Sequence, residues 1–198
     1  RAGGGSGGML VDSGSTLVVG SSASISFNNA SDGDNAGLEL SNSTVVIVGD
    51  ATVNSNFAVY AYGGLHARSS ILNISGSLDA SMNQAKNGAC GGIVSSASTI
   101  RIGDSCSVSE NSAGGGMGGL GLGSSTFAVA GSLTASYNSA MDDIGGVLVD
   151  SSTLLVGGNM TISHNDAEGD TGGLGMSGSQ VSVDGSATIS SNTASGSF

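Results

Sequence analysis

Acidic residues are the groups in this chain whose type and spacing come nearest to a chemical site. Asp142 and Asp143 share one polar loop, and Glu168 and Asp170 share the next polar loop along the chain. Clustered carboxylate oxygens are the ligands that Ca²⁺ prefers. If the two loops stack, these four carboxylates predict a calcium site. A solvated acidic loop is the alternative, and the G-G-x-G-x-D calcium repeat is absent.

Residues that could support catalysis do not form a recognisable set. The two histidines, His66 and His164, fall at different positions of the repeat described below, and Lys86 is isolated in a loop. Serine is so frequent that combinations of serine, histidine and an acid carry no information about a nucleophilic triad. We therefore expect a protein that is not an enzyme and that needs no cofactor, apart from the calcium considered above.

Small hydroxyl side chains are expected to form a regular array on one outer face. Near the end of each repeat, two residues that are two positions apart point away from the apolar side. The array is best developed at Thr134, Ser136, Thr161, Ser163, Thr188 and Ser190. Comparable T-x-T arrays bind ice in other solenoids, so this face is the candidate for an ice- or carbohydrate-binding surface. The alternative is that these residues only keep an exposed strand soluble.

Four asparagines carry the N-x-S/T pattern of glycan acceptors. They are Asn29, Asn42, Asn73 and Asn159. Because serine and threonine are so common in this chain, a similar number of matches is expected by chance. Asn73 and Asn159 are expected to point outward and could accept a glycan if a eukaryotic cell secretes the chain.

An internal repeat determines the elements that position all these residues. Asparagine recurs every 27 or 28 residues, followed two positions later by alanine and eight or nine positions later by a glycine. The asparagines are Asn28, Asn56, Asn83, Asn111, Asn138, Asn165 and Asn192. A fixed period of this size indicates a solenoid, in which each repeat forms one coil.

Each repeat contains three short segments in which apolar and polar residues alternate. In residues 145–171 the alternating positions expected to point inward are Val147, Val149, Leu154, Val156, Met160 and Ile162. Period-two alternation between turn residues indicates β-strands. The sequence therefore predicts an all-β fold, a right-handed parallel β-helix (β-solenoid) of seven coils with three short strands per coil. The right-handed winding is inferred from the general preference of β-crossovers.

The recurring polar residues are expected to be structural rather than ligand-binding. Asparagine tolerates left-handed backbone angles and bonds to nearby backbone, and stacked asparagines can bond to one another as a ladder. A glycine pair can supply a positive φ or a close backbone approach. A serine column before the second strand is expected to bond to backbone at another corner, at Ser15, Ser43, Ser70, Ser98, Ser125, Ser152 and Ser179.

Two cysteines, Cys90 and Cys106, are too few for a disulfide framework. Cys106 falls in a column otherwise filled by alanine, leucine and methionine, which predicts a buried apolar thiol. A bridge between Cys90 and Cys106 is the alternative, and spacing alone does not decide between them.

Composition excludes two classes of partner. The net charge is −11, with four basic residues against 15 acids. Nucleic-acid binding needs clustered lysine and arginine to neutralise phosphates, so we expect no nucleic-acid partner. There is no apolar run long enough to span a bilayer, so we expect no membrane insertion. Residues 1–198 are expected to form a single domain that is a piece of a longer repeat protein or of a filament.

The repeat unit, N-x-A followed by a short loop, G-G and an aliphatic residue, resembles the repeats of chlamydial polymorphic outer membrane proteins. Those carry G-G-A-[ILV] and F-x-x-N motifs, and the resemblance covers all seven units. Here the residue three before each asparagine is isoleucine, valine or alanine instead of phenylalanine, and the alanine after the glycine pair is absent. The resemblance implies a surface-exposed or secreted right-handed β-helix that serves in adhesion or as a stalk.

The expected function is that of an extracellular or cell-surface rod, stalk or filament shaft with a structural or adhesive role. The expected partners are further coils or a second copy stacked end to end, together with glycans or other surface proteins. The alternative is the ice- or carbohydrate-binding module that uses the hydroxyl face.

Overall fold

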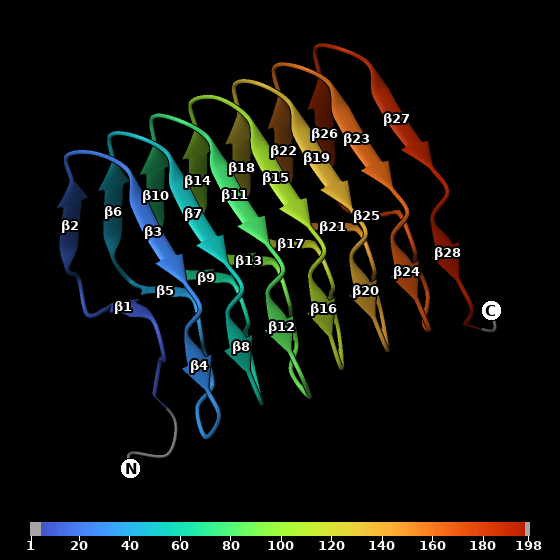
Figure 1. Ribbon diagram of the computed structural model, residues 1–198. Coiled ribbons are helices and arrows are strands. Elements are labelled where there is room, and N and C mark those ends of the chain that lie inside the picture. The colour runs from blue at the N-terminus through green and yellow to red at the C-terminus, as the bar shows by residue number, and fades with distance from the viewer. Residues whose placement is uncertain (1–4, 197–198) are drawn as a thin grey trace.

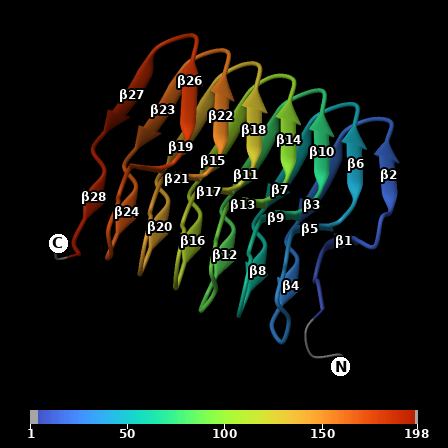
Figure 2. The ribbon, with the colours of Figure 1, turned by 180° about the vertical axis from the view of Figure 1, so that it is seen from behind.

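The structure, a computed structural model, describes residues 5–196 and within them consists of 28 strands in four parallel sheets of seven. Each coil contributes one strand to every sheet (Figure 1). The chain rises along the rear sheet, crosses at the top and descends along the front while it advances from left to right. This winding is right-handed, and the same path is seen from behind in Figure 2. The fold is therefore a right-handed parallel β-solenoid of seven coils.

The first two strands of each coil form sheets 1 and 2. Sheet 1 consists of β1 (Met9–Val11), β5 (Leu38–Ser41), β9 (Leu65–Arg68), β13 (Ile93–Ser96), β17 (Leu120–Gly123), β21 (Val147–Asp150) and β25 (Leu174–Ser177). Sheet 2 consists of β2 (Thr16–Val19), β6 (Thr44–Ile47), β10 (Ile71–Ile74), β14 (Thr99–Ile102), β18 (Thr126–Val129), β22 (Thr153–Val156) and β26 (Gln180–Val183).

The third and fourth strands of each coil form sheets 3 and 4. Sheet 3 consists of β3 (Ala23–Ser26), β7 (Ala51–Asn54), β11 (Leu78–Ser81), β15 (Cys106–Ser109), β19 (Leu133–Ser136), β23 (Met160–Ser163) and β27 (Ala187–Ser190). Sheet 4 consists of β4 (Asn29–Ala30), β8 (Phe57–Ala58), β12 (Gln84–Ala85), β16 (Ser112–Ala113), β20 (Ser139–Ala140), β24 (Asp166–Ala167) and β28 (Thr193–Ala194). The sequence predicts only three strands per coil. The fourth, in sheet 4, has two residues and is too short to show an alternating pattern.

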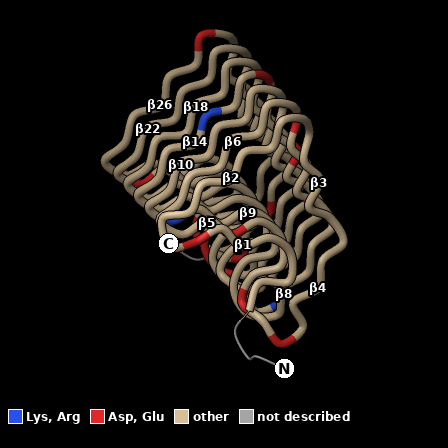
Figure 3. The backbone as a smooth tube through the Cα atoms, turned by 90° about the vertical axis from the view of Figure 1, so that its left-hand side faces the viewer, with Lys and Arg blue, Asp and Glu red and all other residues tan. Residues whose placement is uncertain are grey.

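Neighbouring coils pair residue for residue, so like side chains lie over like. In sheet 2, for example, Ile100 is the register partner of Leu72 on one side and of Phe127 on the other. In a view with the N-terminal coil toward the reader, the coils lie behind one another with the same outline (Figure 3). Alternating residues of sheets 1, 2 and 3 point inward and form one continuous apolar core, in which Phe127 is fully buried. A single coil could not bury this surface alone, so stacking is what stabilises each coil.

Two corners of each coil are made by one residue in the left-handed region. At the first corner it directly precedes the recurring asparagine, at Phe27, Ser55, Met82, Glu110, Tyr137, His164 and Ser191, with φ between 53° and 58°. At the second corner, the left-handed residue directly precedes the recurring serine, as Ser69 precedes Ser70. The expectation that the asparagines themselves take left-handed angles was therefore wrong. The preceding residue turns the chain, and the turn directs the asparagine inward.

The paired glycines allow a close approach of backbones and do not supply a positive φ. A Cβ on Gly64 would collide with the Gly92 carbonyl oxygen, and a Cβ on Gly92 would collide with the Gly119 carbonyl oxygen. None of these glycines has a positive φ. The second glycine of each pair is therefore required because adjacent coils approach backbone to backbone at this corner.

A second, smaller packed seam covers the outer face of sheet 1. A column of bridge residues, Tyr62, Cys90, Met117 and Ile144 among them, pairs from coil to coil just before sheet 1. Tyr62 and Met117 each pack against the residue four positions later. Tyr62 stacks on His66 with ring centroids 3.9 Å apart, and Met117 fills the space above Gly121.

Candidate functional site

The seven recurring asparagines form a continuous hydrogen-bonded ladder at the corner between sheets 3 and 4. Asn83 shows the pattern. Its Oδ1 accepts from the backbone N (3.1 Å) and the Nδ2 (2.9 Å) of Asn56. Its Nδ2 donates to Asn111 Oδ1 at 3.1 Å and to the Val53 carbonyl at 2.8 Å. Every polar atom of this buried amide is thereby satisfied, so the ladder is a structural spine with no vacant group for a ligand.

The recurring serines form a second ladder at the corner between sheets 1 and 2. The hydroxyl of Ser98 accepts from the backbone N of Ser70 at 3.0 Å and donates to the Ser96 carbonyl two residues earlier at 2.8 Å. Ser125 repeats the pattern with Ser98 N at 3.1 Å. Because these hydroxyls are buried and bonded, this column is also structural.

The hydroxyl array lies on the outer face of sheet 3, in register from coil to coil. Thr134 pairs with Thr161, and Thr161 pairs with Thr188. Parallel strands are spaced at about 4.8 Å, so the array has that repeat along the solenoid. A shallow hollow of about 480 Å³ lies over the neighbouring coils, where Thr52, Asp79 and Thr134 contribute to its lining. The geometry suits a flat, repetitive ligand. Ser136, Ser163 and Ser190 share the second row of the array. Ser136 is buried, so it does not present its hydroxyl on this face as expected.

The four acids of the candidate calcium site lie in two stacked loops. Thr171 N donates to the Asp143 carbonyl at 3.0 Å, so the loops of neighbouring coils are adjacent. Asp142, Asp143, Glu168 and Asp170 are all exposed. Within residues 5–196 no group of three or more histidine, cysteine, aspartate or glutamate side chains is arranged to hold a metal ion. The calcium site therefore stays a prediction.

The four N-x-S/T asparagines lie at the surface. Asn29, Asn42 and Asn159 are exposed, and Asn73 is half-buried on the outer face of sheet 2. Asn159 Oδ1 accepts from Ser186 N at 2.9 Å, which ties its amide to the next coil. Glycan attachment at these residues stays a prediction.

Both cysteines are free and buried. Cys106 points into the apolar core at the start of β15, whereas Cys90 lies in the seam outside sheet 1. Burial raises the pKa of the Cys90 thiol from 9.0 to about 12. Burial, with a smaller contribution from Asp79, also raises the pKa of Cys106 well above 9.0. Such thiols are protonated and inert as nucleophiles at neutral pH.

The polar end of the seam contains a second pair of groups with shifted pKa values, Tyr62 and His66. Burial lowers the pKa of His66 below 6.5, while Glu39 opposes this shift and Arg68 adds to it. Burial also raises the pKa of Tyr62 above 10.0. His66 Nδ1 is buried without a hydrogen-bond partner. A neutral imidazole stacked on a tyrosine fits a packing role.

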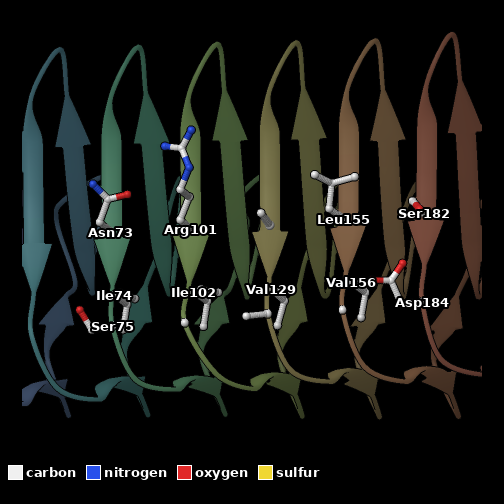
Figure 4. A pocket seen from close by; sticks show the side chains of 14 residues that line it. Asn73, Ile74, Ser75, Arg101, Ile102, Val129, Leu155, Val156, Ser182 and Asp184 are labelled. Carbon is white, nitrogen blue, oxygen red and sulfur yellow. The ribbon is translucent and has the colours of Figure 1, made fainter.

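A hollow on the outer face of sheet 2 was missed by the sequence analysis. It has a volume of about 490 Å³. Arg101 and Leu155 stand on either side of it (Figure 4), and Ala128 and Ala130 also line it. Asp184 lies at its far end. The signal was present in the repeat, because Ala128 is the smallest residue of a column that holds valine, asparagine, arginine, leucine and serine in the other coils.

Comparison of the chain with protein-family models, with curated proteins and with solved structures finds no match in any of the three. No helix within residues 5–196 is long and apolar enough to cross a membrane. The class of protein that the fold defines is a repetitive parallel β-solenoid.

Proposed function

We propose that this chain is an extracellular structural or adhesive β-solenoid, a non-catalytic stiff element of a rod, stalk or filament shaft. The observation that carries the proposal is the unbroken register. Four sheets and the asparagine ladder run through all seven coils without an interruption. At about 4.8 Å per coil this gives a segment roughly 30 Å long, and its stiffness follows from continuous hydrogen bonding along the axis.

The surface supports a role outside the cell. Only 10% of the residues are charged, and the acids and few basic residues are scattered over the coils (Figure 3). Small hydroxyls cover most of sheet 3. The repeat also resembles that of surface-exposed outer membrane proteins, which is the basis for proposing a surface location.

The last strand of sheet 3, β27, is an edge strand of the described residues. All four residues of β27 are exposed, and the core-column residue Ile189 is 50% exposed. An uncovered parallel edge pairs readily with another strand. Further coils, or a second copy stacked end to end, would cover this edge and extend the asparagine ladder beyond Asn192.

Electron microscopy of native material from its source tests the proposal. Rods or filaments with an axial repeat of about 4.8 Å are the expected result. Compact particles that contain the chain without any elongated segment would contradict it.

A second function, an ice- or carbohydrate-binding module, is favoured by the in-register array of threonines on sheet 3. Replacing Thr161 and Thr188 by tyrosine should abolish ice shaping or glycan binding while the fold stays intact. Thr153→Tyr on sheet 2 is the matched control, because it places the same bulk on another face. Unchanged binding in the sheet 3 variant would exclude this module.

A further inference from the structure

The outer face of sheet 2 carries large exposed apolar side chains that the outer face of sheet 3 lacks. Val18 is 63% exposed, Val48 53%, Ile71 41% and Leu155 39%. Every outward position of sheet 3 instead holds serine, threonine, asparagine or aspartate. Val18, Val48 and Ile71 lie on the first three coils, whereas Leu155 borders the hollow. An exposed apolar side chain beside a hollow makes this part of sheet 2 the candidate interaction surface.

The hollow on this face lies beside a projecting apolar side chain. Ala128 is the register partner of Arg101 on one side and of Leu155 on the other. Ala128, which lines the hollow, is therefore one strand away from the projecting Leu155, which is labelled in Figure 4. A second Leu155, presented by another molecule, would fit the recess that Ala128 leaves.

Opposite charges lie at the two ends of the hollow. Arg101 on β14 and Asp184 just after β26 are both exposed, and neither side chain has an ion pair or hydrogen bond to any part of residues 5–196. Their strands are three positions apart in sheet 2, a separation of about 14 Å at the usual strand spacing. They are therefore too far apart to neutralise each other within one molecule.

These features of two copies would meet across a two-fold axis that lies in the interface. The axis runs parallel to the strands, between β18 and β22. It exchanges β18 with β22 and β14 with β26. Leu155 of each copy then lies over Ala128 of the other, and Arg101 lies over Ser182, two residues from the Asp184 of the other copy. Moving the axis by half a strand spacing, onto β18, would set Leu155 against Arg101 instead.

We propose that two copies of this chain pair side by side and antiparallel through sheet 2, with Leu155 seated in the hollow and Arg101 paired with Asp184 twice. Such an interface is isologous and closed, so it gives a dimer and does not propagate. It differs from axial stacking, which adds coils at the ends, and it does not depend on the location or function proposed above. In a shaft it would cross-link two rods laterally.

Sedimentation equilibrium of the intact chain, over a wide concentration range, tests this pairing by charge exchange. The expected result is a monomer–dimer equilibrium. R101E and D184R should each raise the dimer Kd at least about tenfold, because like charges then face each other across the dyad. The double variant R101E/D184R should restore dimerisation. R68E is the matched control, since it makes the same charge change at an exposed arginine of sheet 1.

Filling the hollow gives an independent measurement. Ala128→Phe should abolish the dimer, whereas Thr161→Phe on sheet 3 should leave it unchanged, with circular dichroism showing that both variants fold. A wild-type chain that stays monomeric throughout would overturn the proposal. So would dimers or longer oligomers that are insensitive to R101E, D184R and Ala128→Phe.

Discussion

Asn83 and Asn111 are joined by two hydrogen bonds that end on the same oxygen. The Oδ1 of Asn111 accepts from Asn83 N at 2.9 Å and from Asn83 Nδ2 at 3.1 Å. The same relationship links each asparagine to the next, so one side chain per coil both satisfies the corner backbone and fixes the register of the following coil. The ladder therefore couples local turn geometry to the axial order of the whole solenoid.

Asn111→Ala should destabilise the fold strongly. The substitution removes four hydrogen bonds. It leaves the buried Asn83 N–H without an acceptor, and it leaves Asn83 Nδ2 with only one of its two acceptors, the Val53 carbonyl. At about 1–3 kcal/mol for each unsatisfied buried group, with partial relaxation, we expect a loss of about 3 kcal/mol or more. Urea denaturation measures it. Asn73→Ala, at a half-buried outer position, should change stability by less than about 0.5 kcal/mol. Equal losses in the two variants would refute a special role for the ladder.

Gly92→Ala should also be destabilising, because its Cβ would collide with the Gly119 carbonyl oxygen and lie 3.0 Å from Val108 Cγ1. A backbone atom cannot move aside cheaply, so we expect a loss of about 2 kcal/mol or more. Gly123→Ala is the control, since the nearest atom to its Cβ would be Ser95 O at 4.0 Å. Thermal denaturation of both variants checks this, and a harmless Gly92→Ala would mean that the coils are farther apart than described.

The two thiols should be unreactive in the native protein and reactive after unfolding. A thiol reagent at pH 8 should modify Cys90 and Cys106 only in denaturant, since burial holds both pKa values above 9.0. The folded state therefore retains thiol protons that the unfolded chain releases. This stabilising contribution is complete below about pH 9 and is lost as the pH rises toward the folded pKa of Cys90, about 12. Cys90→Ala should flatten the alkaline decline, and rapid native labelling would contradict the burial.

His66 should make the fold sensitive to acid. Its folded-state pKa is lowered below 6.5 by burial, so the unfolded state binds the proton more tightly. The stability from neutral His66 is complete above the ordinary pKa and is lost as the pH falls through the lower folded value. His66→Phe keeps a ring against Tyr62 and should weaken the decline in stability between pH 7 and 5. An identical decline in the variant would show that His66 is not its source.

The coil count and the inward columns could be predicted because period-two alternation and the recurring asparagine both report on the pairing of adjacent coils. Other features have no such local signal. Phe27 and Tyr137 take left-handed angles that their residue types disfavour, because their position in the corner requires it. The seam of Tyr62 on His66 depends on how the chain folds back outside sheet 1. The hollow at Ala128 is indicated only when its column is compared across all coils, because it depends on the larger neighbours in adjacent coils. Periodicity locates such residues in a coil but does not describe the surfaces that they form together.

The most direct test of the proposed role is immunogold electron microscopy of intact source cells, with an antibody against residues of this chain. We expect label on non-permeabilised cells, distributed along thin projections or over the outer surface. Label that appears only after permeabilisation, inside the cell and unassociated with any elongated structure, would contradict an extracellular shaft.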